Sequence, residues 1–239
     1  FSMVRATDDK LEAAFNRHIS LETAYFASVY ASYFKPDFQE QLKLIPEAAG
    51  RLEYICLCAK EQGLSIYLLI DEYDNFTNTI LSSKGNDVYH SLTHDSGFYR
   101  SFFNVVKGVT TGAEAPVKRM FITGVSPVTL DDVTSGFNIG TNITTDERFN
   151  SMVGFSESEL HEMLSYYQSE GMLVDSIDDI VRMMKPWYDN YCFAKECIGK
   201  TMYNSDMVLY FLNNYLQRKR PPSEMVDRNI RTDYSKLRH

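Results

Sequence analysis

The acidic residues Asp71 and Glu72 directly follow an apolar run in the stretch IYLLIDEYDNF, which spans residues 66–76. The run Ile66–Ile70 has the length of a strand and shows no polar alternation, which predicts a strand covered on both faces, as in the middle of a parallel sheet. In open sheets of this kind, ligands bind at the carboxyl ends of the strands. Two interpretations follow: a magnesium site for nucleotide hydrolysis, or a strand end that is only solvated.

For nucleotide hydrolysis the two carboxylates have different roles. Asp71 would hold Mg²⁺, usually through its water shell, and Glu72 would orient and polarise the attacking water. Adjacent side chains on an extended chain point to opposite sides, so one carboxylate can face the metal and the other the nucleophile. Thr123 ends a second predicted strand, residues 119–123, where it could sense the terminal phosphate or could bond to its own turn.

The elements around these residues predict an α/β arrangement. Helical periodicity indicates one helix around residues 11–19 and another around residues 52–59, which Gly63 should cap. A third helix, Phe98–Lys107, separates the two strands, and its Phe98, Phe102 and Val105 should line one side. Strand, helix and strand make the parallel crossover unit. We therefore expect the acidic tip of the first strand to lie on an inner strand, at the edge of a cleft.

After about residue 150 the pattern indicates helices alone. Ser156, with Glu159 three residues later, makes a capping box that opens the first of them. Ser176 opens a second helix, whose extension Pro186 should limit. A third helix begins at Asn204 or Ser205.

Composition and charge bound the class of protein. With 239 residues, 44% of them hydrophobic, the chain can form one large or two modest domains. The predicted fold class is α/β: a parallel sheet flanked by helices over residues 1–150, then a small, all-helical, lid-like domain over residues 151–239. The formal net charge of −8 disfavours broad, non-specific binding to nucleic acid. No apolar run approaches the ~20 residues of a membrane-spanning helix, and no signal-peptide pattern opens the chain, so we expect a cytoplasmic protein.

Four motifs in sequence order carry a resemblance to a known family: IYLLIDEYDNF, RMFITGVSPVTLDDVTSGFNIG, MVGFSESEL, and WYDNYCF with the later MYNSDMVLYFL. They resemble successive motifs of the predicted AAA-ATPase-like family of P-loop NTPases, whose members often carry a PD-(D/E)XK nuclease-like domain after the ATPase. The resemblance implies that Asp71 and Glu72 are the Walker B pair, that Thr123 is the sensor position, and that residues 135–138 lie in the family's SGFN loop. It further implies ATP and Mg²⁺ as cofactors, and an attached nuclease-like domain or a homo-oligomer as candidate partners.

The chain departs from the family pattern in two places and lacks one motif. Asn190 stands where the family usually has glycine, and Ser205 stands where it has proline, so turns in the helical part should differ. A loop of the form G-x-x-x-x-G-K-[ST] should precede the Walker B strand, and nothing before Ile66 fits it. The nearest stretch, AKECIGKT at Ala194–Thr201, lacks the first glycine and follows no buried strand. Because family members carry this loop upstream, the chain is expected to begin inside the ATPase domain.

Three functions are compatible with the sequence. The first is an ATPase, converting ATP to ADP and phosphate in the intact protein as a conformational switch for an attached effector, with this segment alone inactive. The second is a non-catalytic scaffold whose nucleotide site is dead. The third is metal-dependent cleavage of a phosphodiester by Asp71, Glu72 and Asp74.

Overall fold

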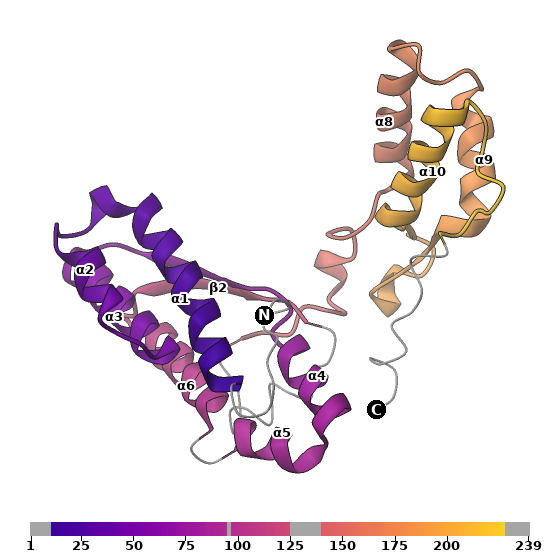
Figure 1. Cartoon of the computed structure of the whole chain (residues 1–239). Coiled ribbons are helices and arrows are strands. Elements are labelled where there is room, and N and C mark those ends of the chain that lie inside the picture. The colour runs from indigo at the N-terminus through magenta and orange to yellow at the C-terminus, as the bar shows by residue number, and fades with distance from the viewer. Residues whose placement is uncertain (1–10, 95–96, 125–139, 228–239) are drawn as a thin grey trace. The chain divides into compact units, whose positions relative to one another are not determined.

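The computed structural model describes residues 11–94, 97–124 and 140–227 (Figure 1). The chain divides into two compact units, with the boundary between Gly140 and Thr141. Each unit has a hydrophobic core of its own.

The first unit combines helices with a two-stranded parallel sheet. Its elements are α1 (Leu11–Val29), η2 (Ala31–Tyr33), α2 (Phe38–Lys43), α3 (Ala48–Glu61), β1 (Ile66–Ile70), α4 (Asn75–Lys84), α5 (Asn86–Thr93), α6 (Phe98–Thr110) and β2 (Val117–Ile122). Strands β1 and β2 run parallel, with Ile66 opposite Val117 and Ile70 opposite Ile122. The predicted parallel crossover is confirmed, although α4, α5 and α6 all lie within it.

Helices α1 and α3 form for the reasons that the sequence indicates, a buried apolar stripe and a glycine cap. Leu11, Phe15 and Ile19 form a buried stripe on α1. Helix α3 ends where Gly63 adopts a left-handed conformation with φ +67°, which glycine reaches without a steric cost. The amide of Gly63 donates to the carbonyl of Lys60 at 3.1 Å, and the amide of Leu64 donates to that of Ala59 at 2.8 Å. This pair of bonds is the Schellman cap that the sequence predicts.

The core of the first unit is aromatic and centres on Phe15. The ring of Phe15 lies 5.6 Å from that of Tyr99 and 5.4 Å from that of Phe102, centroid to centroid. The buried residues of α6 are Tyr99, Phe102, Phe103 and Val106. The predicted stripe of Phe98, Phe102 and Val105 contacts this core as expected, with Phe102 buried and the other two residues partly buried against it.

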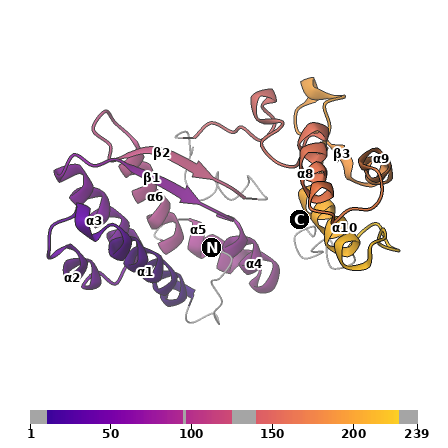
Figure 2. The ribbon, with the colours of Figure 1, turned by 90° about the horizontal axis from the view of Figure 1, so that it is seen from above.

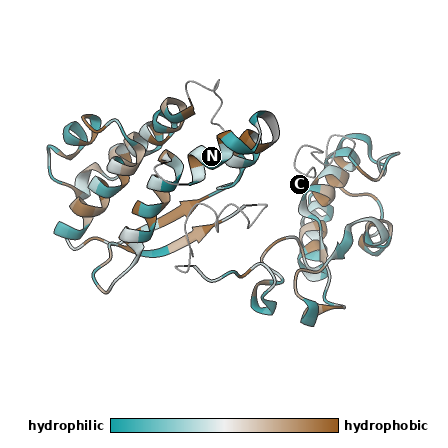
Figure 3. Cartoon of the chain, turned by 90° about the horizontal axis from the view of Figure 1, so that it is seen from below, coloured by the Kyte–Doolittle hydropathy of each residue, from teal (hydrophilic) through white to brown (hydrophobic). Residues whose placement is uncertain are grey.

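The prediction that both faces of β1 are covered is wrong for the residues described. Ile66, Leu68 and Ile70 face the helices, whereas Tyr67 and Leu69 are 67% and 76% exposed. Helices α1, α3 and α6 lie on one side of the sheet (Figure 2). The strands are mostly hydrophobic, apart from Lys118 and Arg119 near the start of β2 (Figure 3), and an apolar run looks the same in sequence whether one face or two are covered.

The prediction of an inner strand also fails within these residues. Strand β1 has one strand neighbour in the described chain, β2, and the two form a two-stranded sheet. The nucleotide-site interpretation was tied to an inner strand, so it must rest on other evidence.

The second unit is mostly helical. Its elements are η3 (Glu147–Phe149), α8 (Glu157–Ser169), α9 (Ile177–Tyr188), β3 (Asp189–Tyr191), η4 (Lys195–Cys197), β4 (Met202–Tyr203) and α10 (Ser205–Arg218). The expectation of an all-helical unit is wrong, because β3 and β4 form a short antiparallel pair. Pro186 lies inside the last turn of α9, and the helix ends two residues later at Tyr188, so the prediction that Pro186 limits the helix is confirmed.

The predicted starts of the three helices are confirmed. Ser156 and Glu159 form the capping box of α8, with side-chain and backbone bonds in both directions. Ser176 accepts a hydrogen bond from the amide of Asp179 at the start of α9. Asn204 caps α10 by accepting one from the amide of Met207 at 3.0 Å. These bonds satisfy amide groups that have no partner within a first helical turn.

Candidate functional site

The three residues singled out by sequence come together at the carboxyl end of the sheet. Asp71 and Glu72 follow β1, Thr123 follows β2, and parallel pairing places the two strand ends side by side. The hydroxyl of Thr123 donates to Asp71 Oδ1 and accepts a hydrogen bond from the backbone amide of Glu72 at 3.3 Å. The Thr123 carbonyl accepts a bond from the amide of Tyr73 at 3.1 Å. The hydroxyl therefore bridges both members of the acidic pair, and among the described residues it makes these bonds and none to its own turn.

The chain turns at Glu72, so the expected extended arrangement of the two carboxylates is wrong. Glu72 has φ +49°, one of two positive φ values among the described residues other than glycine. A left-handed conformation costs such a residue about 1–2 kcal/mol, and residues held this way cluster at functional sites. The carboxylates nevertheless have separate surroundings. That of Asp71 bonds to Thr123, and Glu72 Oε2 accepts from Asn75 Nδ2 at 3.2 Å.

Asp74, the third carboxylate of the cluster, is buried inside the unit. Its relative exposure is 0%, and Asp74 Oδ2 accepts from Asn78 Nδ2 at 3.0 Å. The side chain of Asp71 is exposed and that of Glu72 half-buried. In the described part of the chain, no group of three or more His, Cys, Asp or Glu residues is arranged to hold a metal ion. The geometry thus gives no support to a metal held by all three carboxylates.

Asp71 and Thr123 offer the oxygen donors that suit Mg²⁺. Magnesium prefers oxygen ligands, keeps several of its waters, and is commonly bound through only one or two carboxylates. An exposed carboxylate beside a hydroxyl fits that kind of binding. Asp71 would hold the hydrated ion, and its charge would attract the ion to the strand end.

A cavity of about 530 Å³ runs along β1 and reaches Asp71. Its lining from the strand covers all of Ile66–Ile70, and α1 contributes His18, Glu22 and Phe26. Much of the wall is apolar, and Asp71 is the last residue of the strand segment that lines it. The expectation that the acidic tip borders a cleft is therefore confirmed for Asp71, whereas Glu72 is not among the residues that line this cavity.

The stretch Ala194–Thr201 does not have the form of a phosphate-binding loop. It lies between β3 and β4 in the second unit, and the next helix, α10, begins only at Ser205. Asn150, which is 5% exposed, holds this loop: Nδ2 donates to the carbonyl of Lys200 at 3.1 Å, and Oδ1 accepts from the amide of Ala194 at 3.2 Å. The sequence shows no signal for this role of Asn150, because the bonds depend on long-range packing.

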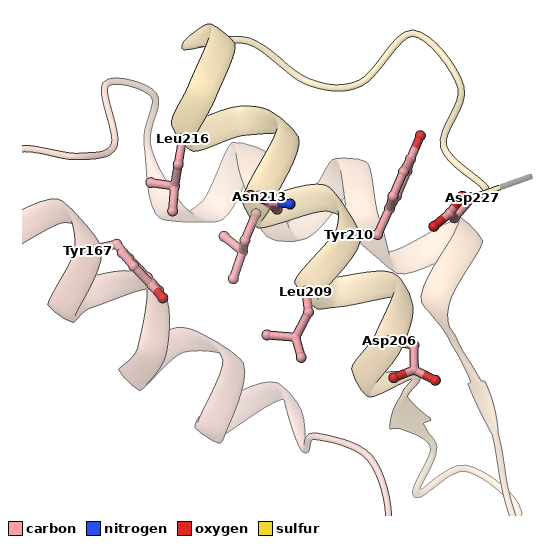
Figure 4. A pocket seen from close by; sticks show the side chains of 8 residues that line it. Tyr167, Asp206, Leu209, Tyr210, Asn213, Leu216 and Asp227 are labelled. Carbon is pink, nitrogen blue, oxygen red and sulfur yellow. The ribbon is translucent and has the colours of Figure 1, made fainter. Parts of the chain in front are cut away.

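A second cavity, of about 480 Å³, lies in the second unit between α8 and α10 (Figure 4). Its lining consists of Tyr167, Asp206, Leu209, Tyr210, Leu212, Asn213, Leu216 and Asp227. None of the predicted site residues belongs to it. Residues 135–138, which the resemblance assigned to the SGFN loop, lie outside the described residues.

These features define the class of the protein. Two parallel strands joined by a helical crossover place an acidic pair and a hydroxyl at their carboxyl ends, as α/β proteins that bind ligands at strand ends do. A family model described as predicted AAA-ATPase matches residues 1–134. The chain belongs to this family.

The other comparisons add no relatives. No curated protein and no solved structure was found to match the chain. Among the residues described, no helix combines the length and the apolar character needed to cross a membrane.

Proposed function

We propose that the chain is part of an ATPase that hydrolyses ATP to ADP and phosphate, with Asp71 holding Mg²⁺ and Glu72 activating the attacking water. The proposal is supported by the family and by one observation: the Thr123 hydroxyl contacts both Asp71 and the amide of Glu72. A hydroxyl at this point can couple the terminal phosphate to the carboxylate of Asp71 and to the backbone of Glu72. Hydrolysis would then act as a conformational switch for an attached effector.

ATP binding and turnover test the role of Glu72, in the protein expressed from its complete coding sequence. Glu72→Gln keeps the shape of the side chain and removes its charge and basicity. We expect ATP affinity to be retained and turnover to fall by about 10²–10⁴-fold, the usual contribution of general base catalysis. Glu53→Gln, an exposed glutamate on α3, is the matched control and should leave turnover unchanged. Equal turnover in wild type and Glu72→Gln would remove Glu72 from its assigned role.

A non-catalytic scaffold, whose nucleotide site is dead, is the second candidate. The discriminating observation is the coding sequence upstream of Phe1. A strand followed by a Gly-Lys-Ser/Thr loop would support the ATPase, since such a loop supplies the backbone amides that cradle phosphates. Absence of that loop would favour the scaffold. The nuclease-like domain, the homo-oligomer and the cytoplasmic location stay predictions.

A further inference from the structure

The turn between β1 and α4 is held by two groups that sequence reasoning did not single out. From α4, Asn75 donates twice to Glu72: the side-chain Nδ2 to Oε2 at 3.2 Å, and the amide to the Glu72 carbonyl at 3.1 Å. From α6, the hydroxyl of Tyr99 donates to the carbonyl of Tyr73, the residue after Glu72. Glu72 is thus restrained both at its carboxylate and at the neighbouring peptide.

Glu72 needs this restraint more than an ordinary surface glutamate. Its left-handed backbone is unfavourable for a residue with a Cβ, and such a conformation persists only where the surroundings hold it. Its side chain has three rotatable bonds, so an unheld carboxylate would sample many directions. A base that must meet one water in one direction loses efficiency if it is misplaced by about 1 Å.

Tyr99 is suited to hold the turn from the side of the hydrophobic core. Its ring is fully buried and packs on Phe15 and Phe76, so its position is set by the core. Burial, and next the charge of nearby Asp74, raise the pKa of Tyr99 well above its usual value. The hydroxyl therefore remains protonated and remains a donor at any physiological pH.

We propose that Asn75 and Tyr99 are positioning residues for Glu72: Asn75 fixes one carboxylate oxygen, and Tyr99 fixes the carbonyl of Tyr73, the next residue. The inference rests on the proposed function, because it assumes that Glu72 acts on a water. Asn75 and Tyr99 act through Glu72 and do not themselves contact the reacting atoms.

The test measures kcat and KM for ATP in the protein expressed from its complete coding sequence. Asn75→Ala removes the donor, and Asn75→Asp keeps the shape but sets a like charge beside Glu72. We expect kcat to fall by about tenfold in Asn75→Ala, and at least as far in Asn75→Asp, with KM changed less than about twofold, because positioning affects the chemical step and not ATP binding. Asn104→Ala, at an exposed position of α6, is the matched control and should match wild type.

A double-mutant cycle separates positioning from a structural role. If Asn75 acts through Glu72, then Glu72→Gln with Asn75→Ala should turn over at the rate of Glu72→Gln alone. A further fall in the double variant, of the size seen in Asn75→Ala alone, would mean an independent structural effect and would overturn the inference. Tyr99→Phe keeps the buried ring and removes only the hydroxyl, and it should follow the same pattern.

The outcomes for the two proposals differ. If Glu72→Gln loses turnover while Asn75→Ala and Tyr99→Phe keep wild-type kcat, the positioning role is wrong and the ATPase proposal stands. If Glu72→Gln turns over like wild type, both are wrong. Loss in all three single variants, with no additional loss in the double variant, supports both.

Discussion

Thr123 is the side chain through which the two strand ends contact each other most directly. Its hydroxyl serves both the carboxylate of Asp71 and the amide of Glu72. Parallel strands bring their carboxyl ends to the same edge of a sheet, so this meeting could be predicted from two apolar runs and a connecting helix. The sensor role that the resemblance assigns to Thr123 stays a prediction.

Removal of the Thr123 hydroxyl should affect stability and turnover together. Thr123→Val keeps the branched shape but leaves Asp71 and the Glu72 amide without this partner. We expect a loss of about 1 kcal/mol in the free energy of unfolding and roughly a tenfold lower kcat. Urea unfolding and steady-state ATP turnover measure the two effects.

Thr111→Val is the matched control, because Thr111 is exposed and its hydroxyl bonds only to the carbonyl of Lys107 on its own helix in the contacts described. Wild-type turnover in Thr123→Val would show that the bridge between Asp71 and Glu72 has no part in the reaction.

Other residues of the site could not be predicted. The contact of Asn75 with Glu72 depends on the left-handed turn at Glu72, and sequence alone favours extended backbone at that position. Tyr99 lies 26 positions from Tyr73, whose carbonyl it bonds, and its aromatic neighbours in sequence made it look like ordinary core. The burial of Asp74 could not be predicted either, since a carboxylate in an acidic run is usually solvated.

At the scale of elements, Gly124, which follows β2, packs closely against the turn after β1. A Cβ at this position would lie 2.2 Å from Tyr73 Cε1 and 2.8 Å from Asp74 Oδ1. No side chain makes contacts that short, so the two segments can approach this closely only because residue 124 is glycine.

Two glycine substitutions should have opposite effects on stability. Gly124→Ala should lower the free energy of unfolding by about 1–3 kcal/mol, because the ring of Tyr73 must shift. Gly108→Ala, inside α6 with nothing within 4 Å of its added Cβ, should raise it by about 0.5–1 kcal/mol through helix propensity. Urea denaturation of both variants measures the difference. A Gly124→Ala variant as stable as Gly108→Ala would show that the two segments do not pack this closely.

The elements themselves were largely predictable, and the errors have physical causes. Helix starts and ends came from caps such as Ser156, Asn204 and Gly63, whose local bonds need no tertiary information. Strands β3 and β4 were missed because three and two residues are too short to show a period. Pro186 in the last turn of α9 removes only one hydrogen bond, and the helix ends two residues after it, as predicted. The prediction that both faces of β1 are covered failed because the burial of a second face depends on which other elements pack against it.

At the scale of the whole molecule, the two units differ in what they contribute. The acidic pair, Thr123 and their supports all belong to the first unit, which also contains the whole family match at residues 1–134. The second unit has a core of its own around Leu160, Tyr188 and Phe211, each of them 0% exposed. A separate core is the condition for a unit to fold without its neighbour.

Residues 141–234 should therefore fold when expressed alone. We expect a helical circular dichroism spectrum and one cooperative transition in urea. Phe211→Ala should destabilise this unit by about 3–5 kcal/mol, because it leaves a cavity in the core. Leu209→Ala, at a position 50% exposed on the same helix, is the control and should cost far less. A gradual, non-cooperative transition in the wild-type segment would contradict the expectation.

The φ of +49° at Glu72 has a consequence for how variants of this protein would change under selection. Glycine would adopt that backbone angle with no steric penalty, but it would bring no carboxylate to the strand end. Selection for heat resistance alone would therefore favour glycine at position 72, and selection for turnover would favour glutamate. Durability and chemistry make opposite demands on this one position.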